Sequence, residues 1–384
     1  LTAFENILLG LDNEYREKEL HTSVTALSET YGLEVNLSSF IGDLSAGERQ
    51  RVEIIRALIQ KPKLLIMDEP TSVLTPFECE SLFKTLKTLA SEGTSILYIS
   101  HKLKEIADLC DTASVLRKGA MVGEYDPKKM TAKELGEIMV GQSLFQPKRP
   151  DATNKNDRVL DVKLNEVKPD TQFGVTLKNI DLEVNKSEIL GIGGVAGNGQ
   201  EELMQILTGE KIDQSASIKY MGNDIELLNP RERREMGLAF APEERLGHAA
   251  VANLNLLDNC LITDPKKHFQ KKMGFINFDE LSVYANEIIE KFNVRTTSSK
   301  ALASSLSGGN LQKFVIGREI GQKPSLFIVN QPTWGVDALS AAKIRQAIVK
   351  IANAGAAIIL ISQDLDEILE ISTKVAFLLS LIHI

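Results

Sequence analysis

Short apolar runs alternate with longer amphipathic segments along the chain. The runs over 63–67 and 95–100 each predict a buried strand. The segment between them has leucines at helical spacing, which are Leu82, Leu86 and Leu89. A helix is therefore predicted from about residue 77, with Gly93 as its stop signal, and an amphipathic helix is predicted from Ser45. Strands that alternate with helices favour an α/β fold, with a mostly parallel sheet and helices outside it.

The same pattern occurs twice along the chain. Residues 44–71 read LSAGERQRVEIIRALIQKPKLLIMDEPT and residues 306–333 read LSGGNLQKFVIGREIGQKPSLFIVNQPT, so they match at an offset of 262 without a gap. A second match, LTAFENILL at 1–9 against LNLLDNCLI at 254–262, has an offset of 253. A chance repeat of this length is implausible, and we interpret the chain as two copies of one domain.

A polar segment separates the two copies. Residues 146–157 read QPKRPDATNKND, hold two prolines and lack periodicity, so they are interpreted as a linker. The first domain is predicted over 1–145. The second is predicted over 158–384, where a strand-rich segment begins.

Composition narrows the possible classes of function. The 384 residues carry 44 Lys and Arg against 52 Asp and Glu, and the net charge of −8 argues against a protein that coats nucleic acid. The three cysteines match no metal-ligand spacing and indicate a reduced compartment. The apolar stretches are far shorter than the roughly 20 residues that span a bilayer.

Two carboxylates follow the first predicted strand. The apolar run 64–67 delivers Asp68 and Glu69 to the carboxyl end of a strand, where ligands bind in open α/β sheets. An Asp there can hold Mg²⁺, directly or through water, and Glu69 can polarise an attacking water as a base. Acidic pairs are also common at strand ends that only face solvent, so both interpretations stay open at this point.

Two further features accompany this acidic pair. Ser45 and Gly47 lie at a predicted helix start, where N–H groups and the helix dipole favour an anion such as a terminal phosphate. The alternative is a simple helix cap. His101 follows the second strand, 32 residues after Glu69. A lone histidine is more often structural than catalytic, but its place beside a candidate phosphate site favours a role in catalysis.

Together these motifs resemble the ATP-binding cassette (ABC) ATPases. LSAGERQR at 44–51 looks like their signature motif, and LLIMDEP at 64–70 looks like their Walker B strand, with the catalytic glutamate next to Asp68. SVLT at 72–75 stands where their D-loop lies, and His101 looks like their switch histidine. The resemblance implies tandem P-loop ABC ATPase domains with helical subdomains, ATPase activity, and ATP and Mg²⁺ as cofactors.

The second copy departs from this pattern in an ordered way. A glycine-rich loop at 194–201 follows an apolar strand, but Gln200 and Glu201 stand where a phosphate-binding loop has its Lys and its Ser or Thr. A carboxylate aimed at a triphosphate adds repulsion. Asn330 and Gln331 replace the Asp-Glu pair, and Gln363 replaces the histidine. Each change keeps the size of the side chain but removes its charge or its capacity for proton transfer.

Two interpretations of this second loop stay open. Either the loop binds nucleotide weakly or it is a purely structural glycine turn. Under the first interpretation its nucleotide-binding residues are Gly194, Gly197, Asn198, Gly199 and Gln200.

The resemblance also implies that the halves pair head to tail, with each ATP between one half's loop and the other half's signature. The competent site then uses Asp68, Glu69 and His101 of the first copy. It is closed by the complete second signature, whose residues are Ser307, Gly308, Gly309 and Asn310. The degenerate site is closed by 45–48, and its predicted role is to hold the halves together.

The repeat offset places the first copy's own phosphate loop before Leu1. We therefore interpret the chain as a fragment and expect it to hydrolyse ATP poorly on its own. Residues 380–384 do not continue the repeat and are interpreted as foreign to the protein.

Two cassettes in one chain and LSGGNxQK at 306–313 resemble the ATPase subunit of simple-sugar importers. GVAGNGQEEL at 194–203 and the segment 241–259 look closest to the nucleoside-importing branch. This resemblance implies two membrane permease subunits, an extracytoplasmic solute-binding protein and a place at the cytoplasmic face of the inner membrane. The alternatives are a tandem ABC ATPase that acts on ribosomes and a pseudo-ATPase scaffold. The short linker, the negative charge and the degenerate second copy disfavour the first of these.

Overall fold

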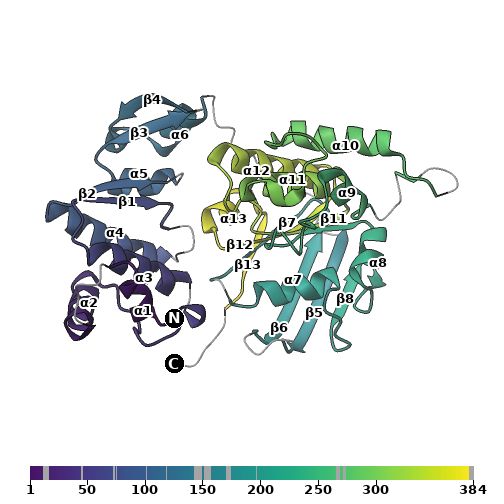
Figure 1. Ribbon diagram of the computed structural model, residues 1–384. Helices are drawn as coiled ribbons and strands as arrows, with labels where there is room; N and C mark the ends of the chain where they lie inside the picture. Colours follow the sequence, from purple (N-terminus) through teal and green to yellow (C-terminus); the bar gives the residue numbers. More distant parts are fainter. Residues whose placement is uncertain are drawn as a thin grey trace. The chain divides into compact units, whose positions relative to one another are not determined.

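The computed structural model divides into two compact units, Leu1–Ser143 and Leu144–Ile384 (Figure 1). Most of the predicted linker lies outside the described residues, but Arg149 within it donates to the Glu370 carbonyl oxygen at 3.4 Å, inside the second unit. The residues that the structure describes are 1–11, 17–44, 46–71, 74, 76–100, 102–117, 119–141, 149–150, 157–169, 174–195, 197–264, 269–270 and 274–379.

Helices are the main secondary structure of the first unit. Its helices are α1 (Ala3–Leu8), α2 (Glu17–Tyr31), α3 (Ala46–Leu58), α4 (Pro76–Ser91), α5 (Leu103–Leu109) and α6 (Ala132–Val140), with 3₁₀ turns at Ile41–Asp43 and Pro127–Lys129. Thr2 and Thr131 start α1 and α6 with capping boxes, in which a glutamate three residues later returns the hydrogen bond. The helices predicted from Ser45 and from about residue 77 are confirmed as α3 and α4.

The strands of the first unit form two small sheets. β1 (Leu64–Asp68) and β2 (Ser95–Ile99) pair in parallel, with Asp68 opposite Ile99. β3 (Ala113–Arg117) and β4 (Ala120–Tyr125) form an antiparallel pair. The core on one face of the β1–β2 sheet joins that face to α3 and α4, and includes Val52, Ile55, Leu65, Met67, Leu82, Leu86 and Leu89.

The opposite face of the β1–β2 sheet is exposed. The side chains of Leu64, Ile66, Leu97 and Ile99 are 54%, 59%, 51% and 45% exposed. The prediction that both strands are buried is therefore wrong for one face of each strand. On the other face Leu65 and Met67 of β1 are buried, whereas Ile96 and Tyr98 of β2 are only half-buried. Apolarity alone predicts burial on both sides, whereas the structure covers only the side that faces the helices.

The second unit is built on two sheets (Figure 1). A parallel sheet has the order β10-β11-β12-β7-β13, with every neighbouring pair parallel. An antiparallel sheet has the order β6-β5-β8-β9. Their strands are β5 (Arg158–Val167), β6 (Leu177–Asn185), β7 (Ile189–Gly193), β8 (Ser217–Tyr220), β9 (Asn223–Asp224), β10 (Leu238–Ala241), β11 (Leu326–Asn330), β12 (Ala357–Ser362) and β13 (Lys374–Phe377). The predicted mostly parallel core is confirmed.

Alternate residues of this parallel sheet point into two different cores. On one side Phe327 and Leu360 pack with the helices α10, α11 and α12. On the other side Ile328 and Ile359 pack with the antiparallel sheet and α7. The helices of the unit are α7 (Gln200–Thr208), α8 (Pro230–Glu235), α9 (Leu256–Leu261), α10 (Phe278–Lys291), α11 (Gly308–Gly321), α12 (Ala338–Asn353) and α13 (Leu365–Ile371), with a 3₁₀ turn at Ala303–Ser305.

Candidate functional site

The carboxyl end of β1 carries the predicted acidic pair. Asp68 is the last residue of the strand and is exposed. Glu69 follows with a φ of +45°, and its N–H donates to the Ile99 carbonyl oxygen of β2 at 2.8 Å. A left-handed backbone at a non-glycine residue is uncommon and carries strain. The structure thus turns the chain sharply at Glu69 and holds the turn against the neighbouring strand.

The predicted anion site at the start of α3 is only partly described. Gly47 lies in the first turn of this helix, and the Glu78 carboxylate occupies the space where a side chain at position 47 would lie. Arg51 pairs with Glu78 at 3.3 Å. An acidic group therefore already lies at this helix start. The predicted residues Ser45 and His101 are outside the described residues.

The glycine-rich loop of the second unit is filled by one of its own side chains. Gln200 begins α7 and is buried, and its amide nitrogen donates to the Val195 carbonyl oxygen at 2.9 Å. Its amide oxygen accepts the Asn198 N–H at 3.0 Å. A Cβ atom at Gly194 would lie 2.6 Å from the same amide nitrogen. The Gln200 amide thus occupies the loop from within and satisfies an N–H that a phosphate would otherwise meet.

Two of the loop glycines have positive φ. Gly197 has a φ of +81° and Gly199 has a φ of +101° at the N-cap of α7, conformations that only glycine adopts readily. Glu201, in the first turn of the helix, is exposed and accepts a hydrogen bond from Gln205 at 3.3 Å. The loop therefore needs glycine at positions 197 and 199, and Gln200 stands where a phosphate loop has its lysine.

The carboxyl end of β11 repeats the geometry of β1 with neutral residues. Gln331 has a φ of +52°, and its N–H donates to the Ile361 carbonyl oxygen at 2.8 Å. Asn330 is buried at the strand end, and its amide nitrogen lies 3.5 Å from an oxygen of Glu243. The amide oxygen of Asn330 has no hydrogen-bond partner among the described residues. Gln363 follows β12 and is exposed.

Glu243 is a site residue that the sequence reasoning did not single out. It follows β10 at the same end of the parallel sheet, and burial together with the charge of Glu201 raises the pKa of its carboxyl above the usual range. Its position directly after an apolar strand could have indicated a site residue, because ligands bind at the carboxyl ends of parallel strands.

The second signature begins α11. Ser307 is the N-cap, and its hydroxyl accepts a hydrogen bond from the Asn310 amide at 2.8 Å. The Asn310 amide oxygen accepts the Arg295 N–H at 2.8 Å. A Cβ atom at Gly308 would lie 2.5 Å from an Arg245 guanidinium nitrogen, and one at Gly309 would lie 2.7 Å from a backbone oxygen. Neither glycine accepts a larger residue without rearrangement.

Arg245 is a second residue that the sequence reasoning missed. Its guanidinium lies 4.9 Å from the centre of the Trp334 ring and donates to the Gln312 side chain at 3.0 Å. The Gln312 amide in turn donates to the Gln331 carbonyl oxygen at 3.2 Å. Arg245 therefore connects the signature helix to the turn after β11. No motif in the sequence marks this arginine.

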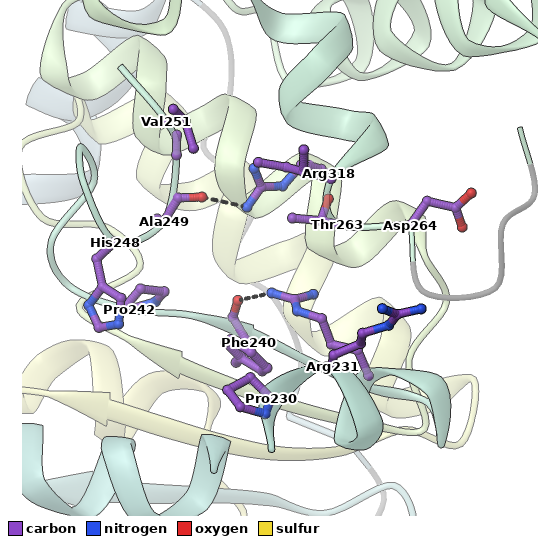
Figure 2. A pocket seen from close by; sticks show the side chains of 13 residues that line it. Pro230, Arg231, Phe240, Pro242, His248, Ala249, Val251, Thr263, Asp264 and Arg318 are labelled. Atoms are coloured by element: carbon purple, nitrogen blue, oxygen red, sulfur yellow. Dashed lines mark hydrogen bonds between the residues drawn. The ribbon is translucent and has the colours of Figure 1, made fainter. Parts of the chain in front are cut away.

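A pocket of about 450 Å³ lies elsewhere in the second unit, beside α8, β10 and α11 (Figure 2). Its three arginines are already paired: Arg234 and Arg318 lie 2.6 and 2.8 Å from the buried Glu319, and Arg231 lies 3.1 Å from Glu235. Burial alone would raise the pKa of Glu319, but the two guanidiniums hold it below its usual range. None of the predicted site residues lines this pocket. Its residues are Pro230, Arg231, Arg234, Phe240, Pro242, His248, Ala249, Ala250, Val251, Ile262, Thr263, Asp264 and Arg318.

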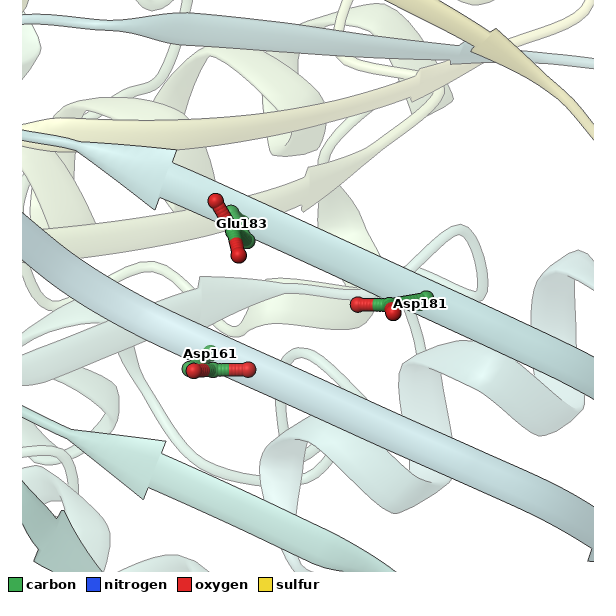
Figure 3. Close-up of side chains that lie close together, drawn as sticks. All are labelled: Asp161, Asp181 and Glu183. Carbon is green, nitrogen blue, oxygen red and sulfur yellow. The ribbon is translucent and has the colours of Figure 1, made fainter. Parts of the chain in front are cut away.

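Three carboxylates of the antiparallel sheet lie close together: Asp161, Asp181 and Glu183 (Figure 3). Their oxygens lie within 4.8 Å of one another. Arg158 pairs with Asp161 at 2.9 Å and with Glu183 at 2.6 Å. The guanidinium thus already neutralises part of this charge, and the cluster is explained as a surface ion-pair group.

Comparison with known proteins supports the interpretation of these motifs. The sequence profile of the ABC transporter family matches residues 1–72 and 177–334. The two matched stretches contain both signatures and both strand-end pairs. The chain belongs to the ABC transporter family. Membership implies an ATP-binding cassette with ATPase activity, as the motifs predicted.

Several curated ABC proteins are similar to this chain over nearly its whole length. The nucleoside import ATP-binding protein NupA of Lactococcus lactis is 37% identical over 381 residues, which cover 98% of this chain and 75% of that protein. The guanosine import ATP-binding protein NupO of Bacillus subtilis is 35% identical, with 98% and 74% covered. The glucose import ATP-binding protein TsgD13 of Haloferax volcanii is 35% identical, with 96% and 66% covered.

Among solved structures, a protein described as RNase-L inhibitor matches with a TM-score of 0.68. It is 17% identical, and the match covers 98% of this ABC chain and 68% of that chain. At this identity the likeness concerns the fold alone. In the described part of the chain, no helical segment combines the length and the apolar character that a membrane span requires.

The strand ends of the two ABC units differ in how well they suit a magnesium nucleotide. Asp68 and Glu69 provide carboxylate oxygens, which are the ligands that Mg²⁺ prefers. In the second unit, neutral amides at Asn330 and Gln331 take their places, and the Gln200 amide fills the glycine loop. The first unit thus offers two carboxylates for the metal at the end of β1, whereas the second offers two amides at the end of β11.

Proposed function

We propose that this protein is the ATP-binding subunit that powers import of a simple sugar or nucleoside through a membrane ABC transporter. The observation that carries the proposal is the 37% identity to a nucleoside import ATP-binding protein over 98% of the chain. The proposed partners are two integral-membrane permease subunits and, indirectly, an extracytoplasmic solute-binding protein. The proposed location is the cytoplasmic face of the membrane.

The first unit carries the chemistry in this proposal. Asp68 would hold Mg²⁺, which supplies charge neutralisation for the phosphates when bound. Glu69 would accept a proton from the attacking water on a carboxylate oxygen. Its left-handed backbone and the 2.8 Å hydrogen bond to β2 support a fixed position for this base. His101 is the proposed second catalytic residue.

The second unit is proposed to lack turnover of its own. The buried Gln200 amide in the loop, the exposed Glu201 and the neutral pair at Asn330 and Gln331 support this part of the proposal. Its signature, which begins at Ser307, remains complete and is proposed to serve the competent site. The head-to-tail pairing that this requires is a prediction from the order of the motifs.

Substitution of the two signature serines tests that pairing. In the full-length protein, Ser307→Arg is expected to reduce ATP hydrolysis more than Ser45→Arg, because only the second signature serves the competent site. The measurement is phosphate release at saturating ATP. Equal losses from the two variants would contradict the cross-paired scheme.

Transport in proteoliposomes tests the function itself. The protein is assembled with its permease and solute-binding partners, and ATP-dependent uptake of labelled guanosine, uridine, ribose and glucose is compared. We expect uptake of one class only, with no uptake when ATP is omitted. ATP turnover without any uptake, together with co-sedimentation of the protein with ribosomes, would favour the ribosome-acting alternative. Absence of turnover in every preparation would favour the pseudo-ATPase scaffold.

A further inference from the structure

We propose that Glu105 is a positioning residue for ATP hydrolysis, because its carboxylate fastens the segment after β1 to the segment after β2. This proposal rests on the proposed function, in which those segments carry Glu69 and His101. Glu105 lies in α5 and is buried. No motif of the sequence singled it out.

The contacts of this carboxylate come from both strand ends. The Thr71 hydroxyl, two residues after Glu69, lies 2.7 and 2.8 Å from the two Glu105 oxygens and donates its one hydrogen to this carboxylate. The Tyr98 hydroxyl of β2 donates at 2.8 Å, and the Ser100 hydroxyl, one residue before His101, donates at 3.3 Å. One side chain therefore connects two segments that are about 30 residues apart in sequence.

A cation completes the group. Lys102 lies 3.3 Å from Glu105, and its ammonium also donates to the Thr71 carbonyl oxygen at 3.1 Å. A buried carboxylate is costly unless donors and an opposite charge compensate it, and here three hydroxyls and one ammonium do so. The surrounding donors thus compensate the negative charge of Glu105. A neutral side chain at this position would weaken the contacts to Thr71 and Lys102.

The equivalent residue of the second unit is Glu367, 262 positions later. It accepts a hydrogen bond from Ser362 at 2.8 Å, and both copies keep the Thr, the Ser and the Glu. Leu360 and Asp364 stand in place of the tyrosine and the lysine. Burial raises the pKa of Glu367 to about 7, although the hydroxyls of Ser362 and Thr333 and the charge of Arg345 oppose that rise.

This difference follows the chemistry of the two units. The unit with a candidate base has the complete set of donors around its carboxylate, and the unit with neutral amides has the reduced set. A role limited to stability does not explain this asymmetry, because the two carboxylates occupy equivalent positions in their units. Each accepts a hydrogen bond from a hydroxyl at or after the carboxyl end of one of the equivalent strands. Positioning of Glu69 and His101 does explain it, because a misplacement of about 1 Å can reduce a rate about 100-fold.

The test compares Glu105→Gln with the matched variant Glu367→Gln, in the whole protein. Steady-state kinetics with ATP should show a loss of at least 10-fold in kcat for Glu105→Gln. KM should stay within about 2-fold, since both Glu105 oxygens are already engaged by protein donors. Glu105→Asp should recover part of the loss, because it keeps the charge. Glu367→Gln should leave kcat within about 2-fold.

Amide hydrogen exchange without nucleotide gives a second readout. Exchange in Glu105→Gln should accelerate in peptides that cover 69–74 and 99–103, and not in α3 or α4. Thr71→Val, which removes only the donor after Glu69, should accelerate the first of these peptides and lower kcat in the same direction. This variant keeps the test valid if Glu105→Gln does not fold.

The outcomes separate this proposal from the proposed function. Absence of ATP turnover in the unaltered full-length protein contradicts the proposed function and leaves the hydrogen-exchange result standing. An unchanged kcat in Glu105→Gln overturns the positioning role. Faster exchange throughout the first unit overturns it as well, because the residue would then act through stability alone. A local increase in exchange together with a loss of kcat supports it.

Discussion

The β1–β2 sheet of the first unit and the β11–β12 sheet of the second have nearly the same apolar pattern but different surroundings. Ile66 is 59% exposed, whereas its counterpart Ile328 is fully buried beneath the antiparallel sheet and α7. Leu97 and Ile359 differ in the same way. The same sequence pattern is therefore a buried layer in one unit and an uncovered apolar face in the other.

The apolar pattern of a strand therefore indicates the environment to which each face is suited. It does not indicate which element covers that face. A run such as LLIM at 64–67 is typical of a strand with neighbours on both faces. In the second unit the cover comes from β5, β6, β8 and α7. We expect the exposed face of the first unit to accept a layer of the same kind.

The largest expected effect concerns the strand ends. Glu69→Gln should reduce ATP turnover by about 10²- to 10⁴-fold while nucleotide remains bound, because the base is lost and the shape is kept. Gln331→Glu should restore no turnover to the second unit, since Gln200 and Asn330 remain. Phosphate release and retention of a fluorescent ATP analogue are the measurements. Normal turnover in Glu69→Gln would contradict the assignment of the base.

The next prediction tests the difference in burial between the two sheets. Ile328→Lys buries an unpaired charge and should lower the free energy of unfolding of the second unit by several kcal/mol. Ile66→Lys places the same charge on the exposed face and should change stability by less than about 0.5 kcal/mol. Urea unfolding of both variants checks this. Equal losses would mean that the face of the first unit is covered in the protein.

Much of this architecture could be predicted from the sequence because local patterns determine it. The leucines of α4 recur at helical spacing, and the repeat at 306–333 fixes the second signature helix and strand. The strand-end pair at Asp68 and Glu69 was found because its flanking apolar run is unbroken. These features depend on neighbours in sequence, which a single chain displays.

The rest depends on contacts between distant segments. The Gln200 amide closes its loop through Val195 and Asn198, a geometry that composition does not reveal. Glu105 joins the two strand ends from α5, and no motif in the sequence marks it. Glu243 follows an apolar strand, but its approach to Asn330 becomes apparent only in the folded structure. The exposure of Ile66 could not be predicted either, since it depends on the absence of a covering layer among the described residues.

The third effect compares the residues that follow β2 and β12. His101→Ala should reduce turnover by roughly 100-fold, because a group placed for proton transfer or charge stabilisation is lost. Gln363→Ala should reduce it by less than about 2-fold, because its unit lacks the base. Single-turnover measurements on both variants separate the chemical step from product release. A large loss in Gln363→Ala would mean that the second unit hydrolyses ATP after all.

The smallest expected effect is a pH dependence of stability in the second unit. The pKa of Glu367 is raised from about 4.5 to about 7 by burial, so the folded state binds a proton that the unfolded state has lost over this interval. Stability should therefore fall as pH rises from about 4.5 to 7, by on the order of 1–3 kcal/mol, and be constant above it as far as this group is concerned.

Glu367→Gln removes this titration and so isolates it. Relative to the unaltered protein, the variant should gain stability between pH 5 and pH 8, because only the unaltered protein then ionises a buried carboxyl. Thermal unfolding of the second unit at both pH values is the measurement, with Glu105→Gln as the matched variant. In the first unit Lys102 compensates the equivalent carboxylate, so neutralising it should destabilise that unit. A gain of stability in both variants at pH 8 would contradict this prediction. It would mean that Lys102 and Tyr98 do not stabilise the charge of Glu105 relative to that of Glu367.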